Sequence, residues 1–242
     1  MQLAETQWVA FMDGDDVSYP QRLEKQISFL QQYPEQSICA VGSRIKYINE
    51  TDEIIAGENG TGPTTLQAFK ELNQKDKNVI VGIFHSTAII HRETFYQIGG
   101  YREIHTPCSD MDIYARLGET GKAILTVPEC LVMYRVHSNA LSIDKAFDLR
   151  KKHHFTIENT QRRRAGQTEL SWEAFLKTRW QKPWYRYPKR RTDWGIILYK
   201  KAGLYYGKRR FFRVMGTLFM ALLIAPEHVA KRVILQIRTI GH

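Results

Sequence analysis

Three carboxylates lie within four positions near the beginning of the chain, at Asp13, Asp15 and Asp16. They follow WVAFM at residues 8–12, a short apolar run that predicts a buried strand. Like charges this close resist ionising together unless a cation or hydrogen-bond donors meet them. Carboxylates suit Mg²⁺ or Mn²⁺, and magnesium usually takes one or two carboxylates plus substrate phosphates. The spacing therefore indicates either a site for such a cation or an acidic surface turn.

The same residues fit a second chemistry. An apolar strand followed by D-x-D-x-V also suits an aspartate phosphatase, with Asp13 as nucleophile and Asp15 as acid/base. That chemistry needs a lysine and further acids at later strand ends, for which the downstream sequence offers no clear candidates. An EF-hand loop starting at Asp13 fails because its fifth position is Val17.

The elements that must position these carboxylates alternate between strands and helices. Residues 18–21 match a capping box with Pro20 in the first turn, and Leu23, Ile27 and Leu30 follow at helical spacing. Further strands are predicted at 38–43, 44–49, 86–91, 123–128 and 130–137, and further helices at 65–72, 92–100 and 109–121. Residues 50–63 predict a surface loop. This alternation indicates an α/β fold.

The charge is unevenly distributed. Residues 1–150 carry 14 Lys+Arg and 20 Asp+Glu, which gives −6, whereas residues 151–242 carry 21 and 5, which gives +16. Such an asymmetry suggests different partners for the two parts rather than a particular fold. Three cysteines without metal-type spacing, Cys39, Cys108 and Cys130, fit ordinary thiols in a reduced cytosolic compartment. We see no signal peptide in the first residues.

The basic second part ends in an apolar run, VMGTLFMALLIA at residues 214–225, preceded by KRRFFR. Twelve residues are too few for a spanning helix, which needs about 20. Basic helices with Trp and Tyr can bind nucleic acid, pack as ordinary helices or lie on a membrane surface. The apolar block favours an anionic membrane surface, because a nucleic-acid binder has no use for it. Packing back onto the protein stays an alternative.

Several segments in order resemble the inverting family 2 glycosyltransferases. Residues 8–26, WVAFMDGDDVSYPQRLEKQ, look like the strand, DxD motif and helix of that family. Residues 84–101 look like its acceptor-side strand and glycine loop, and residues 108–142 like its "ED" helix, strand pair and closing YR-x-H…S element. The resemblance implies a partial GT-A fold, a mixed central sheet flanked by helices. Residues 1–142 would form the C-terminal portion of the catalytic domain and residues 143–242 a basic, membrane-associating helical region.

The resemblance also implies roles for single residues. Asp15, assisted by Asp13 or Asp16, would hold Mg²⁺ or Mn²⁺ and thereby the donor diphosphate. Asp110 would be the base that accepts the acceptor's proton, and a helix N-terminus favours its ionised form. Asp112 is the alternative base, and a plain N-cap is the alternative role for Asp110.

The remaining site residues are expected around these carboxylates. His137 would reach the metal or the diphosphate, or be a structural histidine. Donor or acceptor binding is expected of Gly99, Gly100, Tyr101, His85 and Arg135; the glycines could equally cap a helix, and His85 could be packed beside a strand. One departure weakens the transfer of roles, because Ser109 stands where the family has an acid.

The sequence thus predicts a glycosyltransferase that moves a sugar, with inversion, from a UDP- or dTDP-linked donor to a saccharide or lipid-linked hydroxyl. The expected setting is cell-surface polysaccharide or lipopolysaccharide synthesis at the inner face of the cell membrane, without nucleic acid. The family's nucleotide-binding strands precede the DxD motif, and here only residues 1–7 precede the strand. Three explanations stay open: the sequence is a fragment with an internal start, a second chain supplies this half, or the family's site has been abandoned. A phosphatase that uses Asp13 and a truncated, non-catalytic membrane-surface module remain the alternatives.

Overall fold

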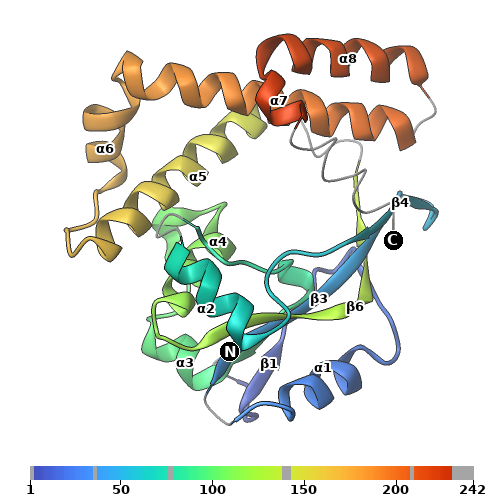
Figure 1. The fold of residues 1–242 in the computed structure, drawn as a ribbon, viewed down its shortest axis with the longest axis vertical. Coiled ribbons are helices and arrows are strands. Elements are labelled where there is room, and N and C mark those ends of the chain that lie inside the picture. Colours follow the sequence, from blue (N-terminus) through green and yellow to red (C-terminus); the bar gives the residue numbers. More distant parts are fainter. Residues whose placement is uncertain (1–2, 35–36, 76–78, 138–142, 208–209, 231–242) are drawn as a thin grey trace. The chain divides into compact units, whose positions relative to one another are not determined.

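The computed structural model describes residues 3–34, 37–75, 79–137, 143–207 and 210–230 (Figure 1). The chain divides into two compact units. The first, which we call the sheet unit, comprises Met1–Val136 and Lys152–Glu169, and the second, the helical unit, comprises His137–Lys151 and Leu170–His242. The predicted boundary after residue 142 did not anticipate that residues 152–169 pack with the sheet.

A mixed sheet forms the centre of the sheet unit. Its strands are β1 (Trp8–Ala10), β2 (Val17–Ser18), β3 (Ile38–Ile48), β4 (Ile54–Asn59), β5 (Ile89–His91) and β6 (Ala123–Arg135). The order is β1-β5-β3-β6-β2, and β4 pairs with β3. The long strands β3 and β6 run parallel, and the other pairs are antiparallel. Each of these long strands replaces two shorter predicted strands, because the β3–β6 pairing resumes after a register shift at the expected breaks, where Ser43 pairs with Val127 and Arg44 with Cys130.

Helices flank this sheet. They are α1 (Arg22–Leu30), α2 (Leu66–Lys75), α3 (Arg92–Gln97) and α4 (Ser109–Gly118), with short 3₁₀ turns at His85–Thr87 and Glu103–His105. Phe69, Phe95, Ile113 and Leu117 from three of these helices join the main core around β3, β5 and β6. The arrangement implied by the resemblance, a mixed central sheet flanked by helices and followed by a basic helical region, is therefore confirmed.

Helix α1 differs from its prediction in two respects. Ser18 lies in β2 and its hydroxyl donates to the Tyr19 carbonyl, so it does not cap the helix, whose N-cap is Gln21. The predicted apolar face is partly exposed, with Leu23 at 54%, whereas Arg22 and Gln26 are buried. These two polar side chains are buried because Arg22 donates to the Phe11 carbonyl and Gln26 to the Thr87 carbonyl, at 2.7 and 2.8 Å.

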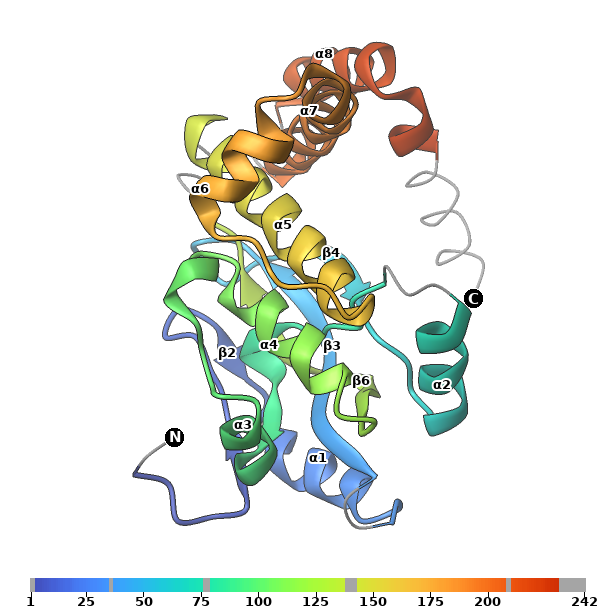
Figure 2. The ribbon, with the colours of Figure 1, turned by 90° about the vertical axis from the view of Figure 1, so that its left-hand side faces the viewer.

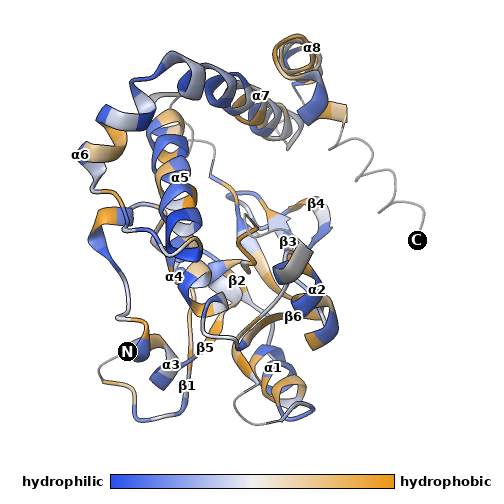
Figure 3. Cartoon of the chain, turned by 60° about the vertical axis from the view of Figure 1, so that its left-hand side comes forward, coloured by the Kyte–Doolittle hydropathy of each residue, from blue (hydrophilic) through white to orange (hydrophobic). Residues whose placement is uncertain are grey.

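The helical unit contains the first half of α5 (Ile143–Arg164), α6 (Trp172–Phe175), a π-helical turn at Leu176–Trp180, α7 (Pro183–Gly207) and α8 (Phe211–Ile224). Helices α7 and α8 lie side by side (Figure 2). A Cβ added to Gly195 of α7 would lie 2.5 Å from that of Ala225, so this glycine permits the close approach. Figure 3 shows α8 as the most continuously hydrophobic helix. Among the described residues, no helix is both long and apolar enough to cross a bilayer.

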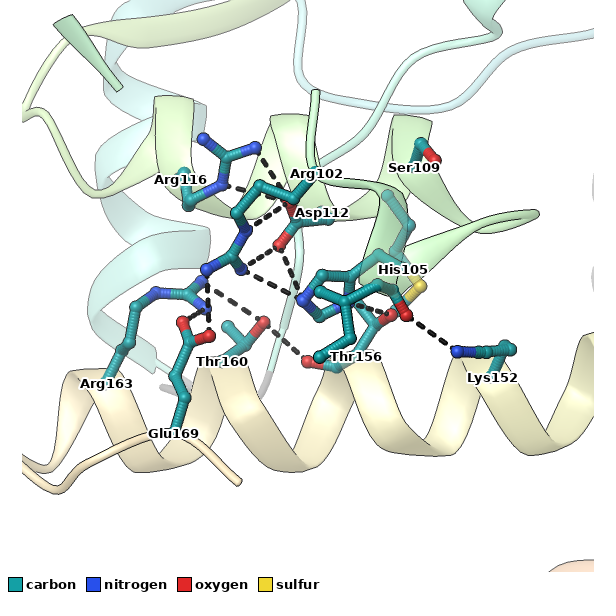
Figure 4. Close-up of polar contacts among 12 residues, drawn as sticks. Arg102, His105, Ser109, Asp112, Arg116, Lys152, Thr156, Thr160, Arg163 and Glu169 are labelled. Atoms are coloured by element: carbon teal, nitrogen blue, oxygen red, sulfur yellow. Dashed lines mark hydrogen bonds and ion pairs between the residues drawn. The ribbon is translucent and has the colours of Figure 1, made fainter. Parts of the chain in front are cut away.

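A buried cluster of charges joins α4 to the second half of α5 in the sheet unit (Figure 4). The Asp112 carboxylate is fully buried and accepts hydrogen bonds from the guanidinium groups of Arg102 and Arg116, two of them at 3.0 Å and one at 2.7 Å. Arg102 also donates to Glu169 at 2.8 Å. The buried His105 lies 3.5 Å from Asp112 and pairs with the Thr156 hydroxyl at 2.9 Å.

This environment argues against Asp112 as the catalytic base. Burial by itself would raise the pKa of Asp112, but the hydrogen bonds from Arg102 and Arg116 more than offset it, and the pKa lies below its ordinary value. A carboxylate that is ionised, buried and shared between two guanidinium groups is a poor proton acceptor. The structure therefore favours a structural role for Asp112 over its expected role as the alternative base.

We expect Asp112→Asn to destabilise the fold by about 3–5 kcal/mol, because it leaves two guanidinium groups without their buried counter-charge. Urea denaturation followed by circular dichroism measures this free energy of unfolding. Asp110→Asn is the matched control, since Asp110 is exposed on the same helix and the substitution should change stability by less than about 0.5 kcal/mol. Equal losses for the two variants would contradict the role given to Asp112.

The same cluster predicts a pH dependence of stability. Burial lowers the pKa of His105 from 6.5 to about 4, so the folded protein holds this histidine neutral. Between these two values the unfolded chain binds a proton that the folded chain does not, and stability falls as the pH falls, by at most about 1.4 kcal/mol per pH unit. Unfolding free energies measured across this window should show a shallower slope in His105→Gln than in the wild type. An unchanged slope would assign the dependence to other groups.

Candidate functional site

The predicted acidic cluster forms the loop between β1 and β2. The loop turns tightly, with the Asp16 amide donating to the Asp13 carbonyl at 3.3 Å. The carboxylates of Asp13 and Asp15 are exposed, whereas Asp16 is half-buried. Strand β1 ends at Ala10, and the Phe11 amide still donates to the Ala88 carbonyl of the segment before β5. The loop leaves the sheet directly after this hydrogen bond. The carboxylates therefore stand at a sheet edge, where the sequence predicts them.

Arg135, at the end of β6, holds this loop in place. Its amide donates to the Asp16 carboxylate at 2.7 Å, and its guanidinium donates to the carbonyls of Asp15 and Asn49, both at 2.7 Å. The guanidinium also pairs with Asp52. Since these contacts engage the guanidinium with the loop itself, the structure favours a loop-positioning role for Arg135 over the expected contact with donor or acceptor.

One carboxylate oxygen of Asp16, Oδ2, is buried and has no hydrogen-bond partner among the described residues. Burial raises the pKa of Asp16 in spite of the Arg135 amide and the nearby Ser86 hydroxyl. An orphaned carboxylate oxygen beside the exposed carboxylates of Asp13 and Asp15 fits a divalent cation. Within the described ranges no three His, Cys, Asp or Glu side chains are gathered to hold a metal, so water and diphosphate oxygens would have to complete the coordination.

Ser86 is a site residue that the sequence analysis missed. Its hydroxyl donates to Asp13 Oδ2 at 2.7 Å and so orients one of the exposed carboxylates. It lies in the 3₁₀ turn just before β5. Because β1 and β5 are antiparallel, the end of one lies beside the beginning of the other. Knowing this pairing would have placed Ser86 next to Asp13.

His85 connects the acidic loop to the glycine loop. Its two ring nitrogens pair with the hydroxyls of Tyr114, at 2.9 Å, and Tyr101, at 2.8 Å. Burial lowers the pKa of His85, although the charges of Asp110 and Asp13 oppose this effect. The neutral ring therefore donates to one tyrosine and accepts from the other. Tyr114 is buried and was not anticipated, since its position in an apolar stretch of α4 gave no sign of a polar partner.

Tyr101 presents a partly exposed ring at the same place. It packs edge-on against Phe11 and Phe95, and burial of its hydroxyl raises its pKa to about 12. The charges of Asp110 and Asp13 also favour a higher pKa of Tyr101, as they do for His85. Hydrogen bonds link these elements: Ser86 bonds Asp13, and its neighbour His85 bonds Tyr101 and Tyr114, the latter one turn after Asp110 in α4.

Asp110 occupies the first turn of α4 and is exposed. It is not the N-cap, which is Cys108, and its side chain accepts from the adjacent Met111 amide at 2.7 Å. Ser109, which stands where the family has an acid, pairs its hydroxyl with that of Thr106. The plain N-cap alternative for Asp110 is thereby excluded, and its carboxylate faces solvent beside the His85–Tyr101 pair.

The double glycine ends α3 as a helix cap. Gly99 and Gly100 have φ values of +78° and +64°, and their amides donate to the carbonyls of Tyr96 and Phe95. Arg116 in turn donates to the Gly100 carbonyl at 2.6 Å. The helix-cap alternative therefore accounts for both glycines, which deliver Tyr101 to the site rather than offering backbone to a sugar.

His137 belongs to the helical unit, and its expected contact with the metal or the diphosphate stays a prediction. The serine of the closing YR-x-H…S element falls in residues 138–142, outside the described residues.

Comparisons with known proteins agree with the resemblance. Residues 1–99 match the family model of glycosyl transferase family 2. An uncharacterized glycosyltransferase of Haemophilus influenzae is 30% identical over 135 residues, 56% of this chain and 47% of its own length. The O-antigen biosynthesis glycosyltransferase WbnJ of Escherichia coli is 30% identical over 141 residues, 54% of this chain and 48% of its own length.

Among solved structures, S. aureus TarS 1-349 in complex with UDP-GlcNAc aligns over 90% of this chain and 68% of that one, at 11% identity and a TM-score of 0.40. The chain spans about half the length of the curated relatives that it matches. The family match over residues 1–99 and these relatives show that this part of the chain is similar to glycosyl transferase family 2.

Proposed function

We propose that this chain forms the acceptor-side half of an inverting glycosyltransferase. The observation that carries the proposal is a set of hydrogen bonds that links the acidic loop to α4: Ser86 bonds Asp13, and its neighbour His85 bonds Tyr101 and also Tyr114, one helical turn after Asp110. A candidate metal ligand and a candidate base linked in this way suit a displacement in which a diphosphate leaves while a hydroxyl attacks.

Asp15, assisted by Asp13 or Asp16, would hold Mg²⁺ or Mn²⁺. When bound, the cation neutralises the charge that develops on the leaving diphosphate. Ser86 fixes the orientation of the Asp13 carboxylate, and Arg135 fixes the loop backbone. These contacts hold the carboxylates in place before any ligand arrives, so less ordering is needed on binding.

Asp110 would accept the proton of the attacking hydroxyl. Its exposed carboxylate lies in the first turn of α4. The partly exposed ring of Tyr101 would stack on the acceptor sugar, while the buried, neutral His85 holds the tyrosine hydroxyl. Attack on the face opposite to the leaving diphosphate inverts the sugar carbon.

The substrates and the setting follow from the family. We propose a UDP- or dTDP-linked sugar as donor and a saccharide or lipid-linked hydroxyl as acceptor, in cell-surface polysaccharide or lipopolysaccharide synthesis at the inner face of the cell membrane. The similarity to WbnJ, a protein of O-antigen biosynthesis, supports this setting.

Donor binding should require both the metal and Asp15. We expect UDP to bind in the presence of Mn²⁺, and Asp15→Asn to weaken that binding at least about tenfold, because the substitution removes a charged ligand. Isothermal titration calorimetry with and without Mn²⁺ measures this effect. Asp148→Asn is the matched control, since Asp148 is an exposed aspartate of the helical unit. Equal binding by both variants, or binding without metal, would contradict the metal role.

Asp110→Asn should separate chemistry from binding. We expect an unchanged affinity for UDP but a kcat about 10²–10⁴-fold lower, because the amide cannot accept the acceptor's proton. Turnover is measured as UDP release from the donor, with the partner half present if the chain alone does not turn over.

Phosphatase activity that needs no nucleotide-sugar and disappears in Asp13→Asn would instead support the aspartate-phosphatase alternative. Vesicle binding with neither activity would indicate the non-catalytic module.

A further inference from the structure

One face of α8 exposes a continuous apolar stripe. The most exposed residues are Phe212 at 94%, Met215 at 71%, Phe219 at 60% and Leu223 at 62%. They are spaced by three or four positions, which places them along one side of the helix. The buried Ala221 marks the opposite side, which faces α7. In the part of the chain that the structure describes, this stripe is the outer surface of the α7–α8 pair.

The stripe contains no polar group that needs water. Thr217 lies in the middle of α8, and its hydroxyl donates to the carbonyls of Arg213 and Val214 within the helix. Between Arg213 and Glu227 the sequence has no charged residue. An exposed helix face of this kind is costly in water and stable in an apolar environment.

The charge that precedes α8 and lies along it is of one sign only. From residue 194 to residue 226 the sequence has no Asp or Glu and six basic residues: Lys200, Lys201, Lys208, Arg209, Arg210 and Arg213. Four of the six immediately precede or begin α8. Arg210 is exposed, and the Arg213 guanidinium lies over the Tyr205 ring, with 5.7 Å between group and centroid. A cationic helix start beside an apolar stripe matches an anionic bilayer surface.

Two other occupants fit less well. A second copy seated on the stripe would bring two segments of six positive charges together, which like-charge repulsion opposes. A nucleic acid would satisfy the charges but leave the phenylalanine and methionine side chains exposed. An anionic bilayer meets both features at once, since its headgroups pair with the basic residues while its acyl chains receive the apolar stripe.

We propose that α8 lies in the headgroup–acyl boundary of an anionic membrane, with Phe212, Met215, Phe219 and Leu223 immersed and the basic residues around its N-terminus on the headgroups. At about 1.5 Å per residue, its 14 residues extend about 21 Å, enough to lie along the surface and too short to cross the bilayer. The inference names the helix that would give the proposed function its membrane location. It rests on the proposed function only for the expectation that a lipid-linked acceptor is met at that surface.

The test is cosedimentation of the full chain with vesicles of phosphatidylcholine alone and of phosphatidylcholine with phosphatidylglycerol. We expect binding to the anionic vesicles that weakens as salt rises. The double variant Phe212→Asp/Phe219→Asp should lower the partition coefficient at least about tenfold, because each phenylalanine withdrawn from the interface costs about a decade or more. Ile54→Asp is the matched control, since Ile54 is 59% exposed on β4 in the sheet unit, and it should bind like the wild type.

A second measurement does not depend on disrupting the surface. Phe219→Trp should show additional fluorescence quenching by brominated acyl chains, relative to the wild type. The inference would be overturned if the double variant bound vesicles as the wild type does, or if Phe219→Trp showed no additional quenching. It would also be overturned if the wild type bound no vesicles and instead formed a dimer that the double variant does not form. UDP titration of the same preparations separates the two proposals, because vesicle binding can fail while donor binding persists, and the reverse.

Discussion

The carboxylate of Asp112, shared between Arg102 and Arg116, is the interaction on which the candidate site depends. Arg116 also holds the Gly100 carbonyl, and Arg102 follows Tyr101 directly in the chain, so the residues on both sides of Tyr101 are tied to one buried anion. Asp110 lies two positions before that anion, in the same helical turn. One buried charge thus fixes the base candidate and the aromatic ring together. Such clusters are costly to bury and are strongly destabilised when one member is lost, which makes them suited to specifying a unique geometry rather than to adding stability.

Strand pairing imposes the second constraint. The antiparallel pairing of β1 with β5 brings the loop that begins at Asp13 beside the turn that contains His85 and Ser86. The long parallel pairing of β3 with β6 delivers Arg135 to the same loop from the other side. The acidic loop is therefore held by contacts from sequence positions far apart, and none of its positioning is local. This is why a short exposed loop can present its carboxylates in a defined arrangement.

The parts of the site that could be predicted from sequence are those encoded locally. The apolar run that ends in Asp13, Asp15 and Asp16 marks a strand followed by an acidic loop, and the pattern after Ser109 marks the beginning of α4. The roles that could not be predicted depend on tertiary contacts. Asp110 and Asp112 are two residues apart and chemically identical, and only the positions of Arg102 and Arg116 make one structural and leave the other exposed. The same holds for α1, whose apolar pattern indicated the helix but gave the wrong buried residues, because hydrogen bonds to the Phe11 and Thr87 carbonyls bury Arg22 and Gln26 instead.

The basic residues and the apolar stripe act over different ranges. At physiological salt, attraction to an anionic surface extends over about 8 Å, whereas insertion of apolar side chains requires contact. A segment that carries six basic residues and no acid would therefore draw the chain to the headgroups first, and the stripe on α8 would then determine how it sits there. Residues 1–150 gain nothing from such a surface by themselves, since they carry a net charge of −6 and are repelled by it. The separation of charge along the chain consequently favours contact of residues 194–226, rather than of residues 1–150, with an anionic surface.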